Sequence, residues 1–520
     1  MADWDVIVIG AGSNGLVLAG ELAAQGARVL ALEARLEAGG LLTTEECSVP
    51  GYWHNMLGAV HNAFAATPPY QQLDLAREYA RFAVPPVQAA LPLRDGRALV
   101  FHTDVEATCR SLATVSARDA QTYRALHARL HPLFASQLVE TLYAPPAPGR
   151  PLWELPADLQ PYASLTPRQV VEALFESPQV QAAVLQQLAV PWGVLPDYAG
   201  MGSMALLALS GAAPLAVALG GAHTTAQALI RALVRRGGRY QVLKPVQRVL
   251  VEDGAAVGVE LSDGTRLYSR AVVSSSGLSQ TLLEMVGAEH LDPALVERVQ
   301  RFQLDEFALF AVHLALARPP RYDTADGAAD AALRVLVGVE TPDECADLWR
   351  EVRAGLLPEP RGMVVTVPSL FDARQAPPGH HTAVLLQPVP YAVTAPPDGS
   401  TVAERWEALR DAYAARCVAA WRRYARNLTD SDILAQVPLT PHDIAVRYRN
   451  YARGALGMGR MSADQAGGNR PLPELAQYRT PLRGLYLCGT CMHPGPGWLG
   501  AAGHNAAQIV ARDLGLRPGG

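Results

Sequence analysis

The fold is decided by the stretch Asp5-Val6-Ile7-Val8-Ile9-Gly10-Ala11-Gly12-Ser13-Asn14-Gly15. Its continuous apolar run up to Ile9 is typical of a parallel strand that is buried on both faces. Apolar residues at helical spacing follow from Leu16 to Gln25, and a second short strand, Val29 to Leu32, ends in Glu33. The order of strand, Gly-x-Gly-x-x-Gly, helix, strand and acidic residue predicts a binding site for a dinucleotide.

Each glycine of this turn has its own physical task. Gly10 permits the tight turn, Gly12 lets a pyrophosphate approach the backbone, and Gly15 lets the helix pack close to the sheet. Ser13 and Asn14 lie at the helix N-terminus, where unpaired N–H groups and the positive end of the helix dipole suit a phosphate. A purely structural glycine turn is the alternative, and the flanking elements argue against it.

Glu33 and the residues after it favour FAD over NAD as the dinucleotide. Glu33 lies at roughly the 20-residue spacing of the acid that accepts both hydroxyls of the adenosine ribose. The run Ala31 to Arg35, followed by Gly39-Gly40, resembles the FAD-dependent amine oxidase and carotenoid desaturase superfamily. That resemblance implies that the residues around Glu33 contact FAD, namely Ala34, Arg35, Gly39, Gly40 and Leu41. Many members have arginine where Leu41 stands.

Two further regions resemble one branch of that superfamily. The stretches Thr43 to Glu46, Pro50 to Tyr52 and Gly58 to His61 look like bacterial phytoene desaturases, especially the desaturase-like carotenoid ketolases. A strand also runs from Gly484 into Gly489, and Thr490 to Gly503 forms a loop that enters a helix rich in glycine and alanine. This is similar to the closing motif of the same branch, whereas amine oxidases usually have Gly-Glu at the strand end.

The resemblance implies where the flavin ring and the adenine lie. The closing motif would contact the flavin through Gly489, Thr490, Trp498, Leu499, Gly500 and Ala501. A helix that starts after Gly500 would stabilise the negative charge of reduced flavin by its dipole and free N–H groups. The backbone of Val246 would face the adenine.

The middle of the chain predicts how the domains are assembled. Short strands are expected at Tyr240 to Leu243, Val246 to Val251, Val257 to Leu261 and Thr265 to Tyr268, before a core strand at Arg270 to Ser274. We therefore expect an α/β fold, with a Rossmann-type FAD-binding domain built from discontinuous segments and an α+β substrate domain. The FAD-binding segments would be 1–75, 220–300 and 451–520, and the substrate segments 76–219 and 301–450.

Two histidines are the candidates for acid–base chemistry. His61 follows the segment that reaches over the flavin in relatives, and His493 precedes Pro494 in the closing loop, so either could accept a proton near neutral pH. A hydrogen-bonded structural role is the alternative for each. Cys488 and Cys491 form a C-x-x-C pair, for which two buried structural thiols are the default interpretation and a redox-active dithiol is the alternative. The histidines and cysteines show no metal-ligand spacing.

Composition limits the partners and the location of the chain. Net charge is −5, which argues against a nucleic-acid partner. No basic leader pattern precedes the first strand, so we expect a cytoplasmic protein. The helical pattern from Val402 to Tyr424 has an apolar stripe beside several arginines, which fits either a core-facing helix or peripheral contact with a membrane.

The expected function is oxidation of a hydrophobic substrate by an FAD-dependent enzyme resembling the desaturases and ketolases. Hydride would pass from a substrate carbon to flavin N5, and oxygen or a quinone would reoxidise the flavin. A redox-neutral isomerase, an oxidase of a small natural product on the same scaffold, and a flavin-bearing interaction protein without turnover are the alternatives. The sequence does not identify the substrate, the electron acceptor, the catalytic base or the oligomeric state.

Overall fold

A computed structural model describes residues 3–62, 64–322, 324, 327–394 and 399–516. The first sheet has a parallel core with the strand order β10, β2, β1, β13, β19. Its strands are Arg239–Gln241, Val29–Leu32, Trp4–Ile9, Arg266–Ser274 and Leu485–Leu487. The apolar run predicted for a strand covered on both faces is β1, and Val6, Ile7 and Val8 are fully buried in it.

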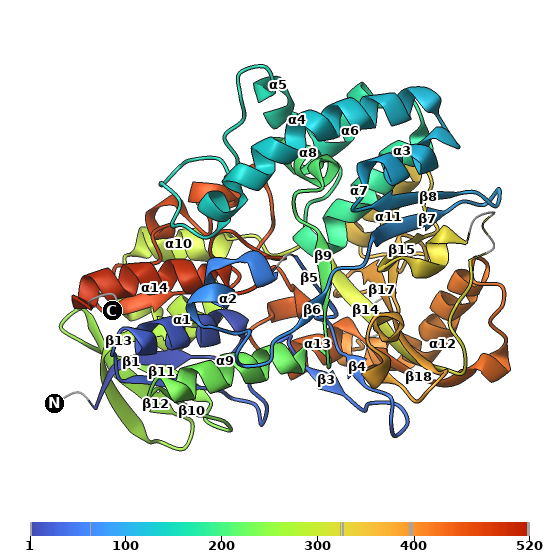
Figure 1. Ribbon diagram of the computed structural model, residues 1–520. Coiled ribbons are helices and arrows are strands. Elements are labelled where there is room, and N and C mark those ends of the chain that lie inside the picture. The colour runs from blue at the N-terminus through green and yellow to red at the C-terminus, as the bar shows by residue number, and fades with distance from the viewer. Residues whose placement is uncertain (1–2, 63, 323, 325–326, 395–398, 517–520) are drawn as a thin grey trace.

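Helices cover this sheet, and residues from distant parts of the chain meet there. Helix α1 (Ser13–Ala24) packs between α9 (His223–Arg235) and α14 (Ala501–Leu514). Figure 1 shows these three helices side by side near both ends of the described chain. The fold class predicted from the sequence, a Rossmann-type α/β unit built from separated segments, is confirmed.

An antiparallel meander is attached to the first sheet. Strand β11 (Val246–Glu252) pairs with β12 (Ala255–Leu261), which pairs with the first half of β13. The two strands predicted at 265–268 and 270–274 are one strand, because β13 passes without a break from the meander into the parallel core. The strand expected at 240–243 is β10, which ends at Gln241.

A second, mixed sheet has the strand order β18, β14, β17, β16, β15, β7, β8. Its strands are Ile433–Leu439, Ala308–Leu316, His381–Val389, Met363–Thr366, Arg334–Val337, Val87–Pro92 and Ala98–His102. Only β15 and β7 pair in parallel among these described strands. Because side chains alternate along each strand, Leu336 and Val364 lie on one face, and Val335 and Val365 on the other.

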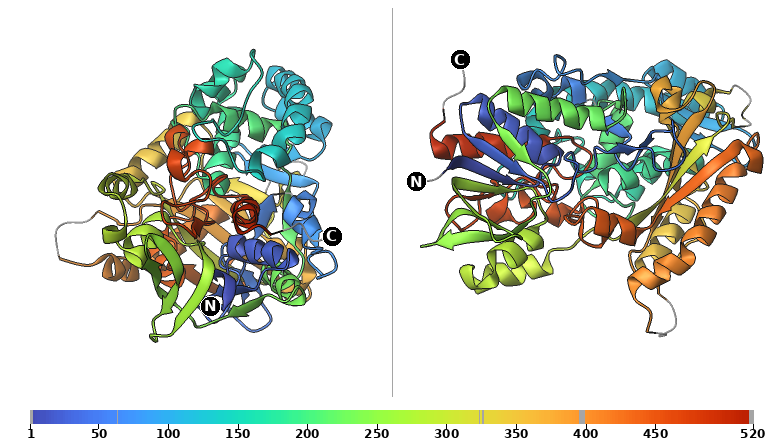
Figure 2. Two further views of the ribbon diagram at one scale, coloured as in Figure 1. Left: turned by 90° about the vertical axis from the view of Figure 1, so that its left-hand side faces the viewer. Right: turned by 90° about the horizontal axis from the view of Figure 1, so that it is seen from below.

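Each face of the second sheet has its own helical cover. The helices on one face are α3 (Val105–Ala113), α4 (Ala117–Leu142), α6 (Pro167–Leu174), α7 (Pro178–Trp192), α8 (Gly202–Ser210) and α11 (Pro342–Arg353). Helix α12 (Val402–Arg422) packs on the opposite face, as Figures 1 and 2 show. The apolar stripe of α12 is buried there, since Trp406, Tyr413, Cys417 and Trp421 are at most 1% exposed.

Short elements connect the two sheets. Strand β5 (Val60–Asn62) pairs with β9 (Leu215–Ala218), which also pairs with β6 (Phe82–Ala83). The other short elements are β3 (Thr44–Glu45), β4 (His54–Asn55), α2 (Pro68–Gln72), α5 (Gln160–Ala163), α10 (Pro293–Arg301) and α13 (Pro441–Arg447). No helix in the described ranges is both long and apolar enough to cross a membrane.

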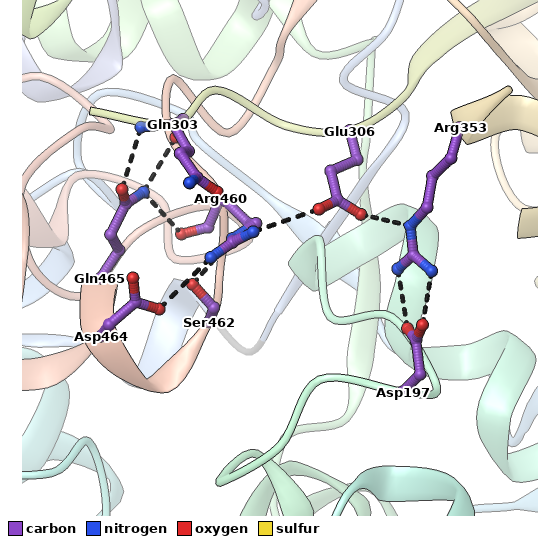
Figure 3. Close-up of polar contacts among 8 residues, drawn as sticks. All are labelled: Asp197, Gln303, Glu306, Arg353, Arg460, Ser462, Asp464 and Gln465. Atoms are coloured by element: carbon purple, nitrogen blue, oxygen red, sulfur yellow. Dashed lines mark hydrogen bonds and ion pairs between the residues drawn. The ribbon is translucent and has the colours of Figure 1, made fainter. Parts of the chain in front are cut away.

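A chain of ion pairs holds the segment in which the backbone passes from α10 to β14. Figure 3 shows Glu306 between two arginines: it accepts from Arg353 Nε at 2.5 Å and from Arg460 Nη1 at 3.2 Å. Arg353 also forks onto both carboxylate oxygens of Asp197, and Arg460 reaches Asp464. These groups are partly exposed, so each pair contributes at most about 1 kcal/mol. Together they join the segment before β14 to the end of α11, the loop before α8 and the loop around Arg460.

The distribution of strands supports a division into two domains. The first sheet takes its strands from residues 4–32, 239–274 and 485–487, and the second from residues 87–102 and 308–439. We propose on this basis that the boundaries given above, 1–75, 220–300 and 451–520 for one domain and 76–219 and 301–450 for the other, describe the two domains.

Candidate active site

The glycine turn lies where β1 ends and α1 begins. Gly10 has φ +88°, a conformation that favours glycine, and Gly12 precedes the helix without any side-chain cap. A Cβ atom on Gly15 would lie 2.1 Å from the carbonyl oxygen of Gly10, so only glycine lets α1 start this close to the turn. The first N–H groups of α1 are therefore free to bind an anion.

Glu33 is held in place at the end of β2. Its two carboxylate oxygens accept hydrogen bonds from the backbone N–H groups of Ala11 and Arg35, each at 3.0 Å. The N–H of Gly39 donates to the carbonyl oxygen of Ala11 at 2.7 Å, which brings the second glycine pair against the first turn. The carboxylate keeps free lone pairs for two hydroxyl groups, as the ribose assignment requires.

The start of α14 lies against the first turns of α1 and borders the same site. Gly500 has φ +72°, and a Cβ atom there would lie 2.7 Å from Val17 Cγ2. A Cβ atom on Gly503 would lie 2.0 Å from the carbonyl oxygen of Asn14. The small residues of the closing motif thus let the two helix N-termini lie next to each other.

A cavity of about 630 Å³ extends from this turn to the second sheet. Most residues that the sequence analysis assigned to FAD line it: Gly10, Gly12, Ser13, Asn14, Glu33, Ala34, Arg35, Gly40, Leu41, Val246, Thr490, Trp498 and Leu499. Gly15, Gly39, Gly489, Gly500 and Ala501 are outside the lining. Four of these five are glycines at which the chain packs too closely for a side chain. For example, a Cβ on Gly489 would lie 2.7 Å from the carbonyl oxygen of Ser275. Ala501 is the fully buried first residue of α14.

One wall of the cavity, which follows α13, was not predicted from the sequence. Residues 446–451 line it, together with Lys244, Ser275 and Ser276. The Tyr448 hydroxyl lies 3.0 Å from Thr43 Oγ1, and the Arg35 guanidinium lies 4.8 Å from the centre of the Tyr448 ring. The alternation of arginine and tyrosine from Arg447 to Tyr451 was the available signal. It lies at the boundary that we drew between two domains.

His61 lines the cavity. It lies on β5, is 6% exposed, and its Nε2 is buried without a hydrogen-bond partner in the part of the chain that the structure describes. Burial lowers the pKa of His61 to about 4, so the ring is neutral at pH 7. The neighbouring Asn62 donates to the carbonyl oxygen of Gly497 at 2.6 Å, which fastens this strand to the closing loop.

The structure does not bring His493 to the cavity. Its Nε2 lies 2.8 Å from the carbonyl oxygen of Thr141 in α4, and the ring is buried behind the closing loop. Glycine and proline after His493 turn the chain, so that Gly495, Pro496 and Gly497 face the cavity instead. The expectation that His493 lines the site is corrected accordingly.

Cys488 and Cys491 are both free and fully buried, and burial raises the pKa of the Cys491 thiol to about 11. The pKa of the Cys488 thiol is raised as well, for the same reason. Across the described residues, no cluster of three or more histidine, cysteine, aspartate or glutamate side chains is suited to hold a metal ion.

The geometry fits FAD and defines a class of protein. Free helix N–H groups beside a glycine cradle suit the pyrophosphate, a fixed carboxylate suits the ribose, and a second helix N-terminus, that of α14, lies beside the first. This arrangement is that of a Rossmann-type flavin-dependent oxidoreductase. Residues 8–73 match a model of the NAD(P)-binding Rossmann-like domain.

Comparison with known proteins gives the family. The chain is 30% identical to a component of the limonene dehydrogenase of Castellaniella defragrans over 534 residues, which covers 98% of this chain and 95% of the relative. It is 24% identical to the lycopene-forming phytoene desaturase of a Paracoccus species over 529 residues, or 98% and 97% of the two chains. A putrescine oxidase variant shares the fold, with a TM-score of 0.63 at 15% identity over 99% of each chain.

The chain therefore belongs to the phytoene desaturase-like family of FAD-dependent oxidoreductases. Its cofactor is FAD, as the spacing from Glu33 to Gly40 predicted.

Proposed function

We propose that this enzyme dehydrogenates an apolar substrate of terpenoid size. The observation that carries the proposal is the continuous cavity that joins the glycine turn to the second sheet. Apolar side chains make up most of its far wall, namely Val60, Val190, Leu215, Leu309, Val364, Val384 and Leu386. Relatives named for limonene and phytoene support a substrate of this kind.

We assign the cofactor contacts on the same basis. Gly10, Gly12, Ser13 and Asn14 would hold the pyrophosphate, and Glu33 the ribose. The adenine would lie beside Val246, and the flavin ring beside Leu41, Thr490, Trp498 and Leu499. Gly15, Gly39, Gly489 and Gly500 would support these contacts through the close packing described above, and Ala501 as the buried first residue of α14. When bound, the flavin accepts a hydride from a substrate carbon at N5.

His61 is the residue that we propose accepts the proton lost with the hydride. Its ring is neutral at pH 7 and has a buried Nε2 without a partner at the edge of the cavity. A positioned base of this kind accelerates proton transfer by roughly 10²–10⁴-fold.

Replacing His61 by glutamine is expected to slow flavin reduction by at least roughly a hundredfold. Because the pKa of His61 is about 4, the wild-type rate should not change with pH around 6.5, where an exposed histidine titrates. Rapid-mixing absorbance measures both quantities, and bound FAD should be equal in the two proteins. An unchanged rate in H61Q would assign the proton to water.

Anaerobic mixing with candidate substrates tests the proposed function itself. Among limonene and acyclic terpenes tested as hydrocarbons, alcohols and acids, at least one is expected to bleach the oxidised-flavin absorbance and to yield a product with two fewer hydrogen atoms. Oxygen or a quinone added afterwards should restore the colour, and the faster of the two is the acceptor; a quinone would imply contact with a membrane. Turnover that needs pre-reduced flavin and leaves the substrate's mass unchanged would instead show an isomerase.

A further inference from the structure

Arg334 lies at the apolar end of the cavity. It is the first residue of β15, is 8% exposed, and lines the cavity on the face of the second sheet that also carries Val364 and Val384. Since Val335 pairs with Val365, Arg334 and Thr366 are neighbours across β15 and β16. Leu333, next to it, packs against Leu215 of β9, so this end of the cavity adjoins the strand pair that carries His61.

Nothing in the described part of the protein offsets the charge of Arg334. Its Nε is buried without a hydrogen-bond partner, and burial is the one cause acting on its pKa, which falls to about 10. The guanidinium therefore stays positively charged at pH 7. Glu33, the one carboxylate among the described lining residues, belongs to the ribose end of the cavity.

Arg470 shows what a structural buried arginine looks like in the same chain. It is fully buried, and its guanidinium donates to backbone carbonyl oxygens, among them those of Gly457 at 2.7 Å, Thr490 at 3.0 Å and Gln465 at 3.1 Å. Arg334 has no such set. A buried charge without compensation is strongly unfavourable, so a protein that retains one is expected to supply its partner from a ligand.

Other polar atoms near this end also lack partners. Thr366 Oγ1, His61 Nε2 and Asn62 Oδ1 are all buried without a hydrogen bond to any described residue, and all three residues line the cavity. A hydroxyl beside a guanidinium is a donor pair suited to a carboxylate, which arginine can bind through two parallel hydrogen bonds.

We propose that Arg334 and Thr366 bind a carboxylate on the substrate, so that the substrate is an apolar acid of terpenoid type rather than a pure hydrocarbon. This inference rests on the proposed function, because it assigns the far end of the cavity to the substrate. A site built to pair with a polar group discriminates strongly against an analogue without it. The acid should therefore be preferred over the hydrocarbon of the same skeleton.

Calorimetric titration of the FAD-loaded protein tests this without turnover. The probes are geranic acid, geraniol and myrcene, which share one acyclic skeleton. The first carries a carboxylate, the second a hydroxyl, and the third no polar group. Wild-type protein is expected to bind the acid roughly a hundredfold more tightly than the alcohol. Arg334→Met should remove that preference and leave the affinity for geraniol unchanged, and Arg334→Lys should restore part of it.

Two controls separate this role from a structural one. Arg334→Met should leave FAD occupancy unchanged and should unfold at the same or a higher temperature than wild type, because it removes an uncompensated buried charge. Arg94→Met, which removes a half-exposed arginine paired with Glu340 and Glu344, should bind the acid like wild type.

The inference and the proposed function fail in different ways. Wild-type protein that binds geranic acid no more tightly than geraniol, or R334M that retains the preference, would overturn the carboxylate site. Loss of FAD from R334M would assign the arginine to the cofactor and overturn it as well. Tight, Arg334-dependent binding of the acid without any bleaching of the flavin would leave the site standing and contradict the proposed dehydrogenation.

Discussion

Replacing Glu33 by alanine is expected to yield protein that is purified largely without FAD. The substitution removes the acceptor for two ribose hydroxyls, and each charge-assisted hydrogen bond contributes about 1.5–3 kcal/mol. The loss of about 3 kcal/mol or more raises the Kd for FAD by roughly a hundredfold or more. It also leaves the N–H groups of Ala11 and Arg35 without their acceptor, so the glycine turn itself loosens.

Absorbance of the purified protein and fluorescence titration of FAD into stripped protein give the occupancy and the Kd. Glu37→Ala, which removes an exposed carboxylate four residues further on, is the matched control and should bind FAD like wild type. Full occupancy in E33A would refute the assignment of Glu33 to the ribose.

Replacing Gly503 by alanine is expected to lower the free energy of unfolding by up to about 3 kcal/mol, the usual limit for a buried steric clash. Helix propensity alone predicts the opposite sign, because alanine is more favourable than glycine in a helix by about 1 kcal/mol. The new Cβ atom would lie 2.0 Å from the carbonyl oxygen of Asn14, a backbone atom that cannot move without shifting the start of α1. FAD binding should weaken with it, because both helix N-termini border the cavity.

Gly20→Ala is the control for this prediction. Gly20 is also a buried glycine inside a helix, but its new Cβ atom would meet only the end of the Leu73 side chain, at 3.1 Å. Its stability in chemical denaturation should stay near that of wild type or rise. A G503A variant as stable as G20A would show that the contact between α1 and α14 is not tight.

Local sequence patterns were enough to predict those parts of the fold that depend on one short segment alone. The strand, glycine turn and helix of residues 5–24 follow from apolar runs and glycine spacing, and the structure has them at nearly the predicted bounds. The α12 stripe was ambiguous, because a helix that packs on a sheet and one that lies on a membrane have the same pattern. Only the tertiary structure shows that this stripe is buried against the second sheet.

Residues that act through distant partners were not predictable in this way. Arg334 lies in a short apolar strand and has no distinguishing neighbour in the sequence; what sets it apart is a buried Nε that finds no hydrogen-bond partner among the described residues. His493 was misplaced for the related reason that the direction of a side chain in a Gly/Pro loop depends on the turn. Residues 446–451 reach the cavity only because α13 brings them there.

The walls of the cavity have a consequence for biosynthesis. Residues around the glycine turn form one wall, and Thr490 with residues 495–499 forms another, which closes only when β19 has joined the sheet and α14 has docked on α1. On the ribosome the chain therefore carries an incomplete nucleotide site until β19 and α14 have been synthesised. A ligand that needs both walls can bind only after that segment has folded. How tightly α14 packs on α1 then determines how firmly the ligand is held.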